Sequence, residues 1–131
     1  MLRYASISTG PPAEAWALLA RPARWHEWSP HVRGAWGLGD GEVRAGARGA
    51  ARLLGVVPVP ASVTRVDAPR TWTWRVGPVE LGHEVRALGD GGCEVATTLR
   101  AAHALEPLLA VTYGPVVALL MRNLARVAAR P

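Results

Sequence analysis

The stretch before residue 30 constrains the fold of this chain most. An apolar, strand-like segment over residues 2–9 is followed directly by the paired prolines Pro11–Pro12. Proline is favoured at the first position of a helix, because a helix leaves the N–H at that position unpaired in any case. We therefore predict a short helix over about residues 13–19. By the same reasoning Pro22 begins a second short helix, which Pro30 must end.

A strand-rich region is predicted from residue 32 to about residue 102. Glycine- and proline-rich stretches divide it into short segments, and we place turns at residues 37–41, 57–60, 67–69, 77–78 and 89–92. This spacing is typical of an antiparallel meander of about six strands. Three segments alternate clearly, with these residues expected to face inward: Trp72, Trp74 and Val76, then Leu81, His83, Val85 and Ala87, then Val95, Thr97 and Leu99.

The last segment, from about residue 107 to 129, has the period of a helix. Its apolar stripe consists of Leu109, Tyr113, Val116, Leu120, Leu124 and Val127. Pro115 cannot donate a hydrogen bond to the carbonyl of Val111, so we expect a bend there. The predicted fold class is α+β. One domain over residues 1–131 holds a curved antiparallel sheet of about six to seven strands around a long C-terminal helix, with two short helices after the first strand.

Charge and cysteine content narrow the choice of partner and location. All fifteen basic residues are arginines, and they are scattered without a basic stripe despite a net charge of +5, so we expect no nucleic-acid partner. Cys93 is the only cysteine and no leader precedes the first strand, which together favour a reducing, cytoplasmic location. The longest apolar run, residues 107–121, is too short to span a bilayer, so no membrane partner is expected. A monomer and a homodimer are both compatible with the sequence.

Two motifs resemble a metal site and a phosphate-binding loop, but each lacks a feature that such a site needs. His26 and His31 are five residues apart instead of four, and Pro30 breaks the helix that would align them, so we predict no metal site. The glycines of residues 37–41 are not followed by a helix that could hold a phosphate. No organic cofactor is predicted.

Several segments, in their order and spacing, carry a family resemblance. They are Ala13–Trp16 after the paired prolines, Trp25–Pro30, residues 63–69, residues 71–75, Gly82–Val85 and the closing leucine-rich helix. The chain resembles the SRPBCC or START-like superfamily, which has the helix-grip fold, and especially its polyketide cyclase and dehydrase-like members. The resemblance implies an internal apolar cavity that encloses a hydrophobic small molecule, whereas the fold alone does not fix the activity. Aromatase members are thought to use an arginine inside the cavity, but no motif assigns this role to any one of the fifteen arginines. The sequence also leaves open which face of the strand around residues 44–52 looks inward, and therefore whether Arg48 or Arg52 enters the cavity.

The predicted inward positions bring candidate chemical groups together. His83 is a candidate general base for enolisation, and Tyr113 is a candidate donor to the developing oxyanion or the departing hydroxyl. The expected reaction is an intramolecular aldol closure with dehydration, in which positioning supplies much of the rate. The expected ligand-binding residues are Trp28, Trp36, Trp72, Trp74, Val85, Thr97, Leu99, Leu109, Val116 and Leu120.

Structural roles compete with these assignments. An inward histidine is more often hydrogen-bonded to the backbone, and a tyrosine on an apolar helix face is more often a packing residue. Trp25 and Trp28 are expected to close the entrance or to cap the sheet. Two functions therefore remain: a cyclase or dehydratase, and a non-catalytic carrier of a lipid or other hydrophobic metabolite. A weaker third is an interaction domain whose interior is filled by its own tryptophans.

Overall fold

The computed structural model describes residues 1–29, 41–53 and 57–131. Its elements are β1 (Leu2–Ser8), α1 (Pro12–Ala20), the 3₁₀ helix η1 (Pro22–Glu27), β2 (Arg48–Leu53), β3 (Val57–Asp67), β4 (Thr71–Val76), β5 (Val79–Ala87), β6 (Cys93–Arg100), α2 (Glu106–Thr112) and α3 (Gly114–Ala128). Pro30, His31, Trp36 and most of the predicted turn at residues 37–41 lie outside the described residues.

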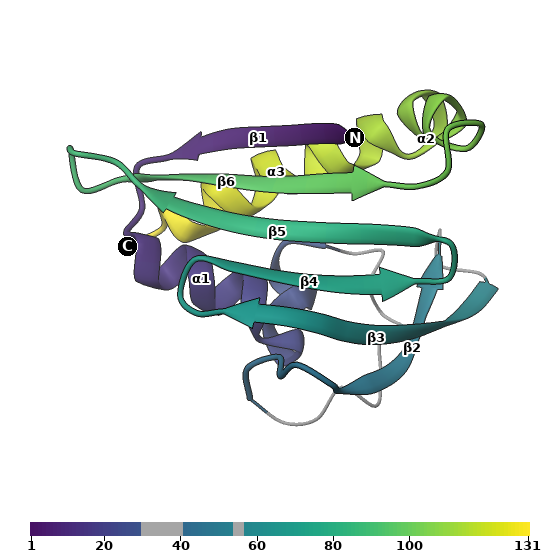
Figure 1. Ribbon diagram of the computed structural model, residues 1–131. Coiled ribbons are helices and arrows are strands. Elements are labelled where there is room, and N and C mark those ends of the chain that lie inside the picture. Colours follow the sequence, from purple (N-terminus) through teal and green to yellow (C-terminus); the bar gives the residue numbers. More distant parts are fainter. Residues whose placement is uncertain (30–40, 54–56) are drawn as a thin grey trace.

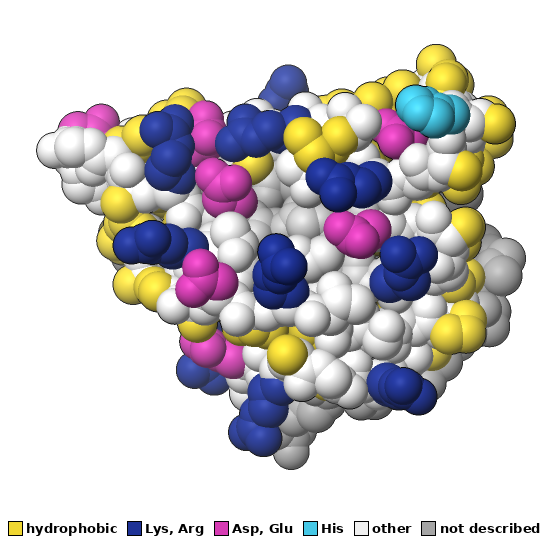
Figure 2. Space-filling model, viewed as in Figure 1, with side chains coloured by type: hydrophobic (Ala, Val, Ile, Leu, Met, Phe, Trp, Pro, Cys, Tyr) yellow, Lys and Arg dark blue, Asp and Glu magenta, His cyan; other side chains and the backbone are white. Residues whose placement is uncertain are grey.

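The strands form one antiparallel sheet in the order β1-β6-β5-β4-β3-β2. Helix α3 lies across one face of this sheet, and α1 and η1 lie on the same face (Figure 1), with α1 against β5 and η1 against β4. The opposite face carries interspersed arginine and acidic side chains (Figure 2), among them the Arg3–Glu94 ion pair at 2.8 Å. The predicted α+β helix-grip architecture is therefore confirmed, with six strands in the described part of the chain.

The alternation of the central strands follows the prediction closely. Trp72, Trp74 and Val76 are buried on β4, and the predicted inward residues of β5 and β6 are buried as well, except one. Ala87 was expected to face inward but is exposed. Ala87 is the last residue of β5, beside the end of the hairpin that projects past the helices (Figure 1), so its short side chain is left uncovered although Cys93 opposite it is buried.

The prediction of a turn at residues 57–60 is wrong. These residues form the start of β3 and pair with β2, with Pro58 opposite Arg52 and Pro60 opposite Ala50. Pairing of β3 with β4 begins only at Ala61, opposite Val76. The two prolines therefore lie where β3 has a single neighbouring strand, and a strand tolerates proline where one of its sides is unpaired.

The C-terminal helix is broken at the predicted place. Helices α2 and α3 meet at Tyr113 with a bend of 57°. Beyond the bend the buried stripe is shifted, so that Val117 and Met121 are buried while Val116 is only half-buried. Val116 was expected in the buried stripe but is only half-buried against the core, because the bend changes the direction in which the helix faces the sheet. Within the described residues no single helix has the length and apolar character needed to cross a bilayer, and α2 and α3 meet these criteria only as a bent pair.

The start of α3 is fixed by close packing against β1. A Cβ atom at Gly114 would collide with the ring and hydroxyl of Tyr4, so only glycine allows α3 to approach β1 this closely. This contact also fixes the position of Tyr113, the residue just before α3.

Candidate functional site

A small cavity lies between the concave face of the sheet and α3. Its volume is about 60 Å³, and it is lined by Trp25, Trp28, Trp72, Trp74, Leu81, His83, Thr97, Tyr113, Val117, Leu120 and Met121. Typical ligand pockets measure about 300–1,000 Å³, and a cavity that holds benzene measures about 150 Å³. The space is therefore largely filled by indole rings.

Strands β4 and β5 supply the aromatic wall of the cavity. Trp72 and His83 are directly opposite each other across the two strands, and their rings stack with centroids 4.1 Å apart at an angle of 15°. Trp74 has its edge toward Trp72, with ring centroids 5.4 Å apart. Residues two apart in a strand point to the same face, which is why one short strand can place both indoles here.

The protonation state of His83 follows from its surroundings. Its Nδ1 atom lies 3.2 Å from the carbonyl oxygen of Trp72, which can only accept, so Nδ1 carries the proton and Nε2 remains an acceptor. Burial lowers the pKa of His83 to about 4, and the hydrogen bond to Trp72 offsets this only in part. At neutral pH His83 is therefore an uncharged imidazole with its tautomer fixed by the backbone.

Two hydroxyl groups join His83 at the cavity. Thr97 lies opposite His83 on β6 and donates to the sulfur of Met121 at 3.3 Å, a weak acceptor. Tyr113 reaches the cavity from the bend between α2 and α3, and burial raises the pKa of its phenol. Tyr113 is therefore protonated at neutral pH and can donate a hydrogen bond. Arg, Asp and Glu do not occur among the lining residues that the structure describes.

Trp25 and Trp28 are held by the end of α1. The last four carbonyls of a helix have no partner within it. In α1 the backbone N–H groups of Arg21 and Val43 donate to Ala17 and Ala20. The remaining two carbonyls accept from indoles, because Trp25 Nε1 donates to Leu19 and Trp28 Nε1 to Leu18, both at 2.9 Å. In a 3₁₀ helix residues three apart lie on the same side, so η1 presents both indoles to α1 and to the cavity.

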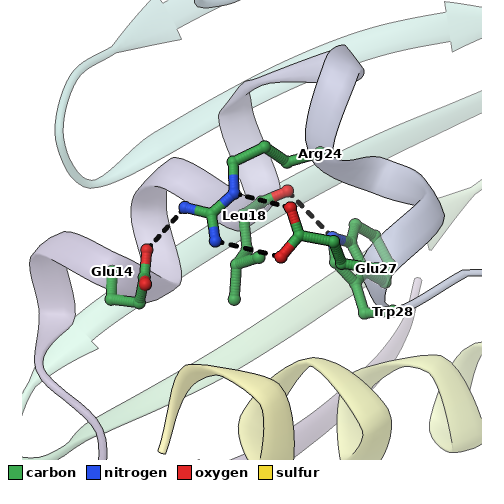
Figure 3. Close-up of polar contacts among 5 residues, drawn as sticks. All are labelled: Glu14, Leu18, Arg24, Glu27 and Trp28. Atoms are coloured by element: carbon green, nitrogen blue, oxygen red, sulfur yellow. Dashed lines mark hydrogen bonds and ion pairs between the residues drawn. The ribbon is translucent and has the colours of Figure 1, made fainter. Parts of the chain in front are cut away.

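An ion-pair cluster holds η1 against α1 on the outside (Figure 3). The guanidinium of Arg24 donates to Glu14 at 2.6 Å and to both carboxylate oxygens of Glu27, at 2.8 and 3.1 Å. The hydrogen bond from Arg24 is the main cause of a lowered pKa of the Glu27 carboxyl. We call η1, its contacts with the end of α1 and this cluster the helical corner.

The indoles of β4 differ from those of the helical corner. Trp72 and Trp74 are 1% and 8% exposed, and their Nε1 atoms are closed off from solvent without an acceptor in the described part of the chain. Buried indole N–H groups usually find a partner, and leaving one unpaired costs about 1–3 kcal/mol. We call Trp72, Trp74 and His83 the aromatic wall.

The structure brings part of the predicted site together. The predicted residues that line the cavity are His83, Tyr113, Trp28, Trp72, Trp74, Thr97 and Leu120. Val85 and Leu99 are buried, and Leu109 and Val116 half-buried, but these four do not line the cavity. Trp36 lies outside the described residues.

Four lining residues were not predicted as ligand contacts: Trp25, Leu81, Val117 and Met121. Leu81 had been placed on the inward face, so its period-2 position was a sufficient signal. Trp25 could have been found from its spacing of three from Trp28, read as one side of a 3₁₀ turn. Val117 and Met121 depend on the bend at Tyr113, which sequence periodicity does not measure.

The structure describes the side chain of only one of the two arginines that could enter the cavity. Arg48 is exposed on β2, and the side chain of Arg52 lies outside the described residues. Within residues 1–29, 41–53 and 57–131, no three His, Cys, Asp or Glu side chains are grouped so that they could hold a metal ion.

Comparisons with solved structures agree with the helix-grip architecture. A hypothetical protein from Helicobacter pylori is 13% identical with a TM-score of 0.78, and the match covers 98% of this chain and 86% of that one. The Aha1 dimer from Colwellia psychrerythraea is 14% identical with a TM-score of 0.73, covering 98% and 97%. DynU16, from the dynemicin biosynthetic locus, is 17% identical with a TM-score of 0.68, covering 94% of this chain and 46% of that one. At these identities the likeness establishes the fold.

The sequence itself matches a family. No curated protein matches it significantly. A family model described as "Polyketide cyclase / dehydrase and lipid transport" matches residues 4–130, which is almost the whole chain. The chain therefore belongs to this polyketide cyclase, dehydrase and lipid transport family, within the SRPBCC or START-like superfamily that its motifs resemble.

Proposed function

We propose that this protein binds an apolar or aromatic, polyketide-like molecule at the aromatic wall and promotes its cyclisation and dehydration. The observation that carries the proposal is the meeting of an acceptor nitrogen on His83 and a protonated phenol on Tyr113 at one cavity without charged lining residues. Apolar walls with a few polar groups are typical of small-molecule sites. We also propose a cytoplasmic location, as the sequence predicts.

The two polar groups suit opposite halves of one reaction. His83 Nε2 removes a proton from the carbon next to a ligand carbonyl, and the enolate carbon bonds to a second carbonyl carbon of the same molecule. Tyr113 protonates the oxygen of that second carbonyl, giving a hydroxyl. The imidazolium of His83 then returns its proton to the Tyr113 phenolate, which resets both groups. In the second step His83 removes the remaining proton from the former enolate carbon while Tyr113 protonates the departing hydroxyl, and the same return of the proton follows, so that one water is lost overall.

The basicity of His83 is compatible with this role. Its pKa of about 4 keeps the imidazole unprotonated at neutral pH, so every molecule has the acceptor available. Bases of carboxylate strength serve for enolisation in apolar sites when the oxyanion is stabilised nearby. Tyr113 is the donor that would stabilise the oxyanion here.

Binding requires the cavity to enlarge. A volume of about 60 Å³ cannot hold a ring system, so a neighbouring group must move. The helical corner is the part that can yield, because Trp25 is the only buried residue of η1, whereas the aromatic wall is part of a paired sheet. We therefore propose that a ligand takes the place of the Trp25 ring, whose centroid lies 5.8 Å from that of Trp72.

A non-catalytic carrier is the second candidate. It is favoured by the uncharged lining and by the weak basicity of His83, because a carrier needs apolar surface and no acid–base pair. The family description names lipid transport beside cyclase and dehydrase activity.

One experiment separates the two functions. The purified protein is incubated with a panel of aromatic polyketides, fatty acids and sterols, and bound species are identified by native mass spectrometry. Products are separated by chromatography, because cyclisation alone conserves mass. If the protein is an enzyme, His83→Leu and Tyr113→Phe each remove turnover while binding persists. If it is a carrier, the ligands are recovered unchanged and the variants alter affinity alone.

A matched control excludes effects of general damage. His26→Gln changes the same residue type as His83 outside the cavity lining, and it is expected to keep wild-type turnover. Absence of binding by the whole panel would contradict both functions and leave the interior as a packed core.

A further inference from the structure

We propose that the ligand is a neutral molecule carrying an acceptor oxygen, such as a ketone, and that the indole N–H groups of Trp72 and Trp74 bind this oxygen. This inference rests on the proposed function, because it names the ligand class of the same cavity and the residues that select it.

The indole partners in the interior divide the tryptophans into two sets. Trp25 and Trp28 donate to carbonyls of α1, and Trp16 donates to Glu42 at 3.2 Å. Trp72 and Trp74 also line the cavity or its surroundings, yet their N–H groups find no acceptor in the described part of the chain. Phenylalanine would serve equally well for packing, so donors without an acceptor among the described residues point to an acceptor that a ligand brings.

The two indoles that carry these donors are neighbours in the same wall of the cavity. Trp72 and Trp74 are two residues apart on one strand, on the same face, with ring centroids 5.4 Å apart. A carbonyl oxygen has two lone pairs and can accept from two donors at once. The cavity therefore has two indole donors without a described acceptor in one wall, beside the space that an oxygen-bearing molecule would enter.

The residues that line the cavity also favour an uncharged ligand. None of its described residues is an arginine, and His83 is uncharged at neutral pH. A carboxylate placed here would lose its hydration without a cation in compensation, which is strongly unfavourable. The inference thus favours ketones over fatty acids as the bound class.

The test compares three probes of one shape: 1-indanone, indane and indane-1-carboxylate. Dissociation constants are measured on the full chain by NMR titration, which detects millimolar binding. We then compare the indane-to-indanone ratio of dissociation constants between the wild type and the Trp72→Phe/Trp74→Phe variant. Each probe loses the same hydration whether it binds the wild type or the variant. The comparison of the two ratios therefore isolates the contribution of the indole donors.

We expect the ratio to be about tenfold higher in the wild type, the effect of two modest net hydrogen bonds. Trp16→Phe is the matched control, since its indole donates to Glu42 outside the cavity, and it should keep the wild-type ratio. Indane-1-carboxylate should bind more weakly than 1-indanone. An unchanged ratio in the double variant, or stronger binding of the carboxylate, would overturn the inference.

A second measurement serves if the double variant does not fold. The infrared carbonyl band of 1-indanone bound to the wild type should lie below its position in hexane, as a hydrogen-bonded ketone requires, and a band at the hexane position would overturn the inference. Failure of this inference and failure of the proposed function give different results. If 1-indanone and indane bind equally, only the inference falls, whereas if neither binds, the proposed pocket falls with it.

Discussion

The helical corner and the aromatic wall both contribute tryptophans to the same cavity, but the indole N–H groups of the two regions differ in their hydrogen bonding. In the corner, the indoles of Trp25 and Trp28 complete the hydrogen bonds of α1. In the wall, Trp72 and Trp74 have no acceptor in the described part of the chain, and His83 is desolvated. The indole hydrogen bonds of the corner therefore stabilise the fold. The unpaired indole donors and the buried imidazole of the wall reduce its stability.

This difference in hydrogen bonding distinguishes tryptophans with a structural role from those that are candidates for ligand binding, even though the ligand is not known. Unpaired buried donors and strongly shifted titratable groups are uncommon in folded proteins and gather at functional sites. Local rules are broken at such sites and obeyed elsewhere. The wall is accordingly where we place ligand recognition, and the corner is where we place the cover that the ligand displaces.

The largest expected effect is the acid sensitivity of the wall. Because the folded pKa of His83 is about 4 and an unperturbed histidine has about 6.5, the unfolded chain takes up a proton in this range while the folded chain does not. Stability should therefore fall as the pH drops from about 6.5 to about 4, by about 3 kcal/mol from this group. Urea unfolding followed across this range should show that this loss is absent in His83→Phe, while the loss from carboxyls with a lowered pKa, such as Glu27, remains.

The matched control for this prediction is His26→Gln. His26 is exposed on η1, so its replacement should leave the acid loss at the wild-type size. If His83→Phe loses as much stability between pH 6.5 and 4 as the wild type does, His83 is not the desolvated group that the wall requires.

A second comparison replaces one tryptophan of each region by phenylalanine. Both Trp25 and Trp72 are almost fully buried, so Trp25→Phe and Trp72→Phe remove similar areas. Only Trp25→Phe also leaves the carbonyl of Leu19 without its donor. We expect Trp25→Phe to be the more destabilising by about 2 kcal/mol, measured by denaturant unfolding. Equal losses would mean that the two regions do not differ as described.

The smallest expected effect concerns the ion-pair cluster outside the corner. Arg24→Gln breaks the contacts with both Glu14 and Glu27 and should lower the free energy of unfolding by about 1 kcal/mol, with a smaller loss in high salt. The control is Arg75→Gln on the outer sheet face, where the exposed pair with Glu80 is longer, at 3.7 Å. We expect almost no change there in thermal unfolding, and similar losses at Arg24 and Arg75 would contradict a special role for the cluster.

The sequence predicted the wall better than the corner, for physical reasons. A strand alternates strictly, so the inward positions of Trp72, Trp74 and His83 follow from spacing alone. The lining role of Trp25 depends on a 3₁₀ turn and on which carbonyls of α1 need a donor. Which of the two valines, Val116 or Val117, lines the cavity depends on the bend at Tyr113.

Proline was informative in one context and misleading in another. Pro12 and Pro22 marked helix starts correctly, because a helix leaves its first N–H groups unpaired. Pro58 and Pro60 were read as a turn, yet they lie in β3 beyond the end of β4. The effect of a strand proline depends on whether a neighbouring strand is present, which local sequence does not state. The cavity volume likewise depends on the packing of four indoles from two regions.

The most direct test is the ¹H–¹⁵N spectrum of the six indole N–H groups in the ligand-free protein, assigned with single Trp→Phe variants. We expect the Trp25 and Trp28 signals to lie downfield with small temperature coefficients, as hydrogen-bonded donors do. Those of Trp72 and Trp74 should lie upfield, at the position of indoles without an acceptor. Downfield signals from all four tryptophans would show that the wall has protein partners after all, and would contradict the distinction between wall and corner.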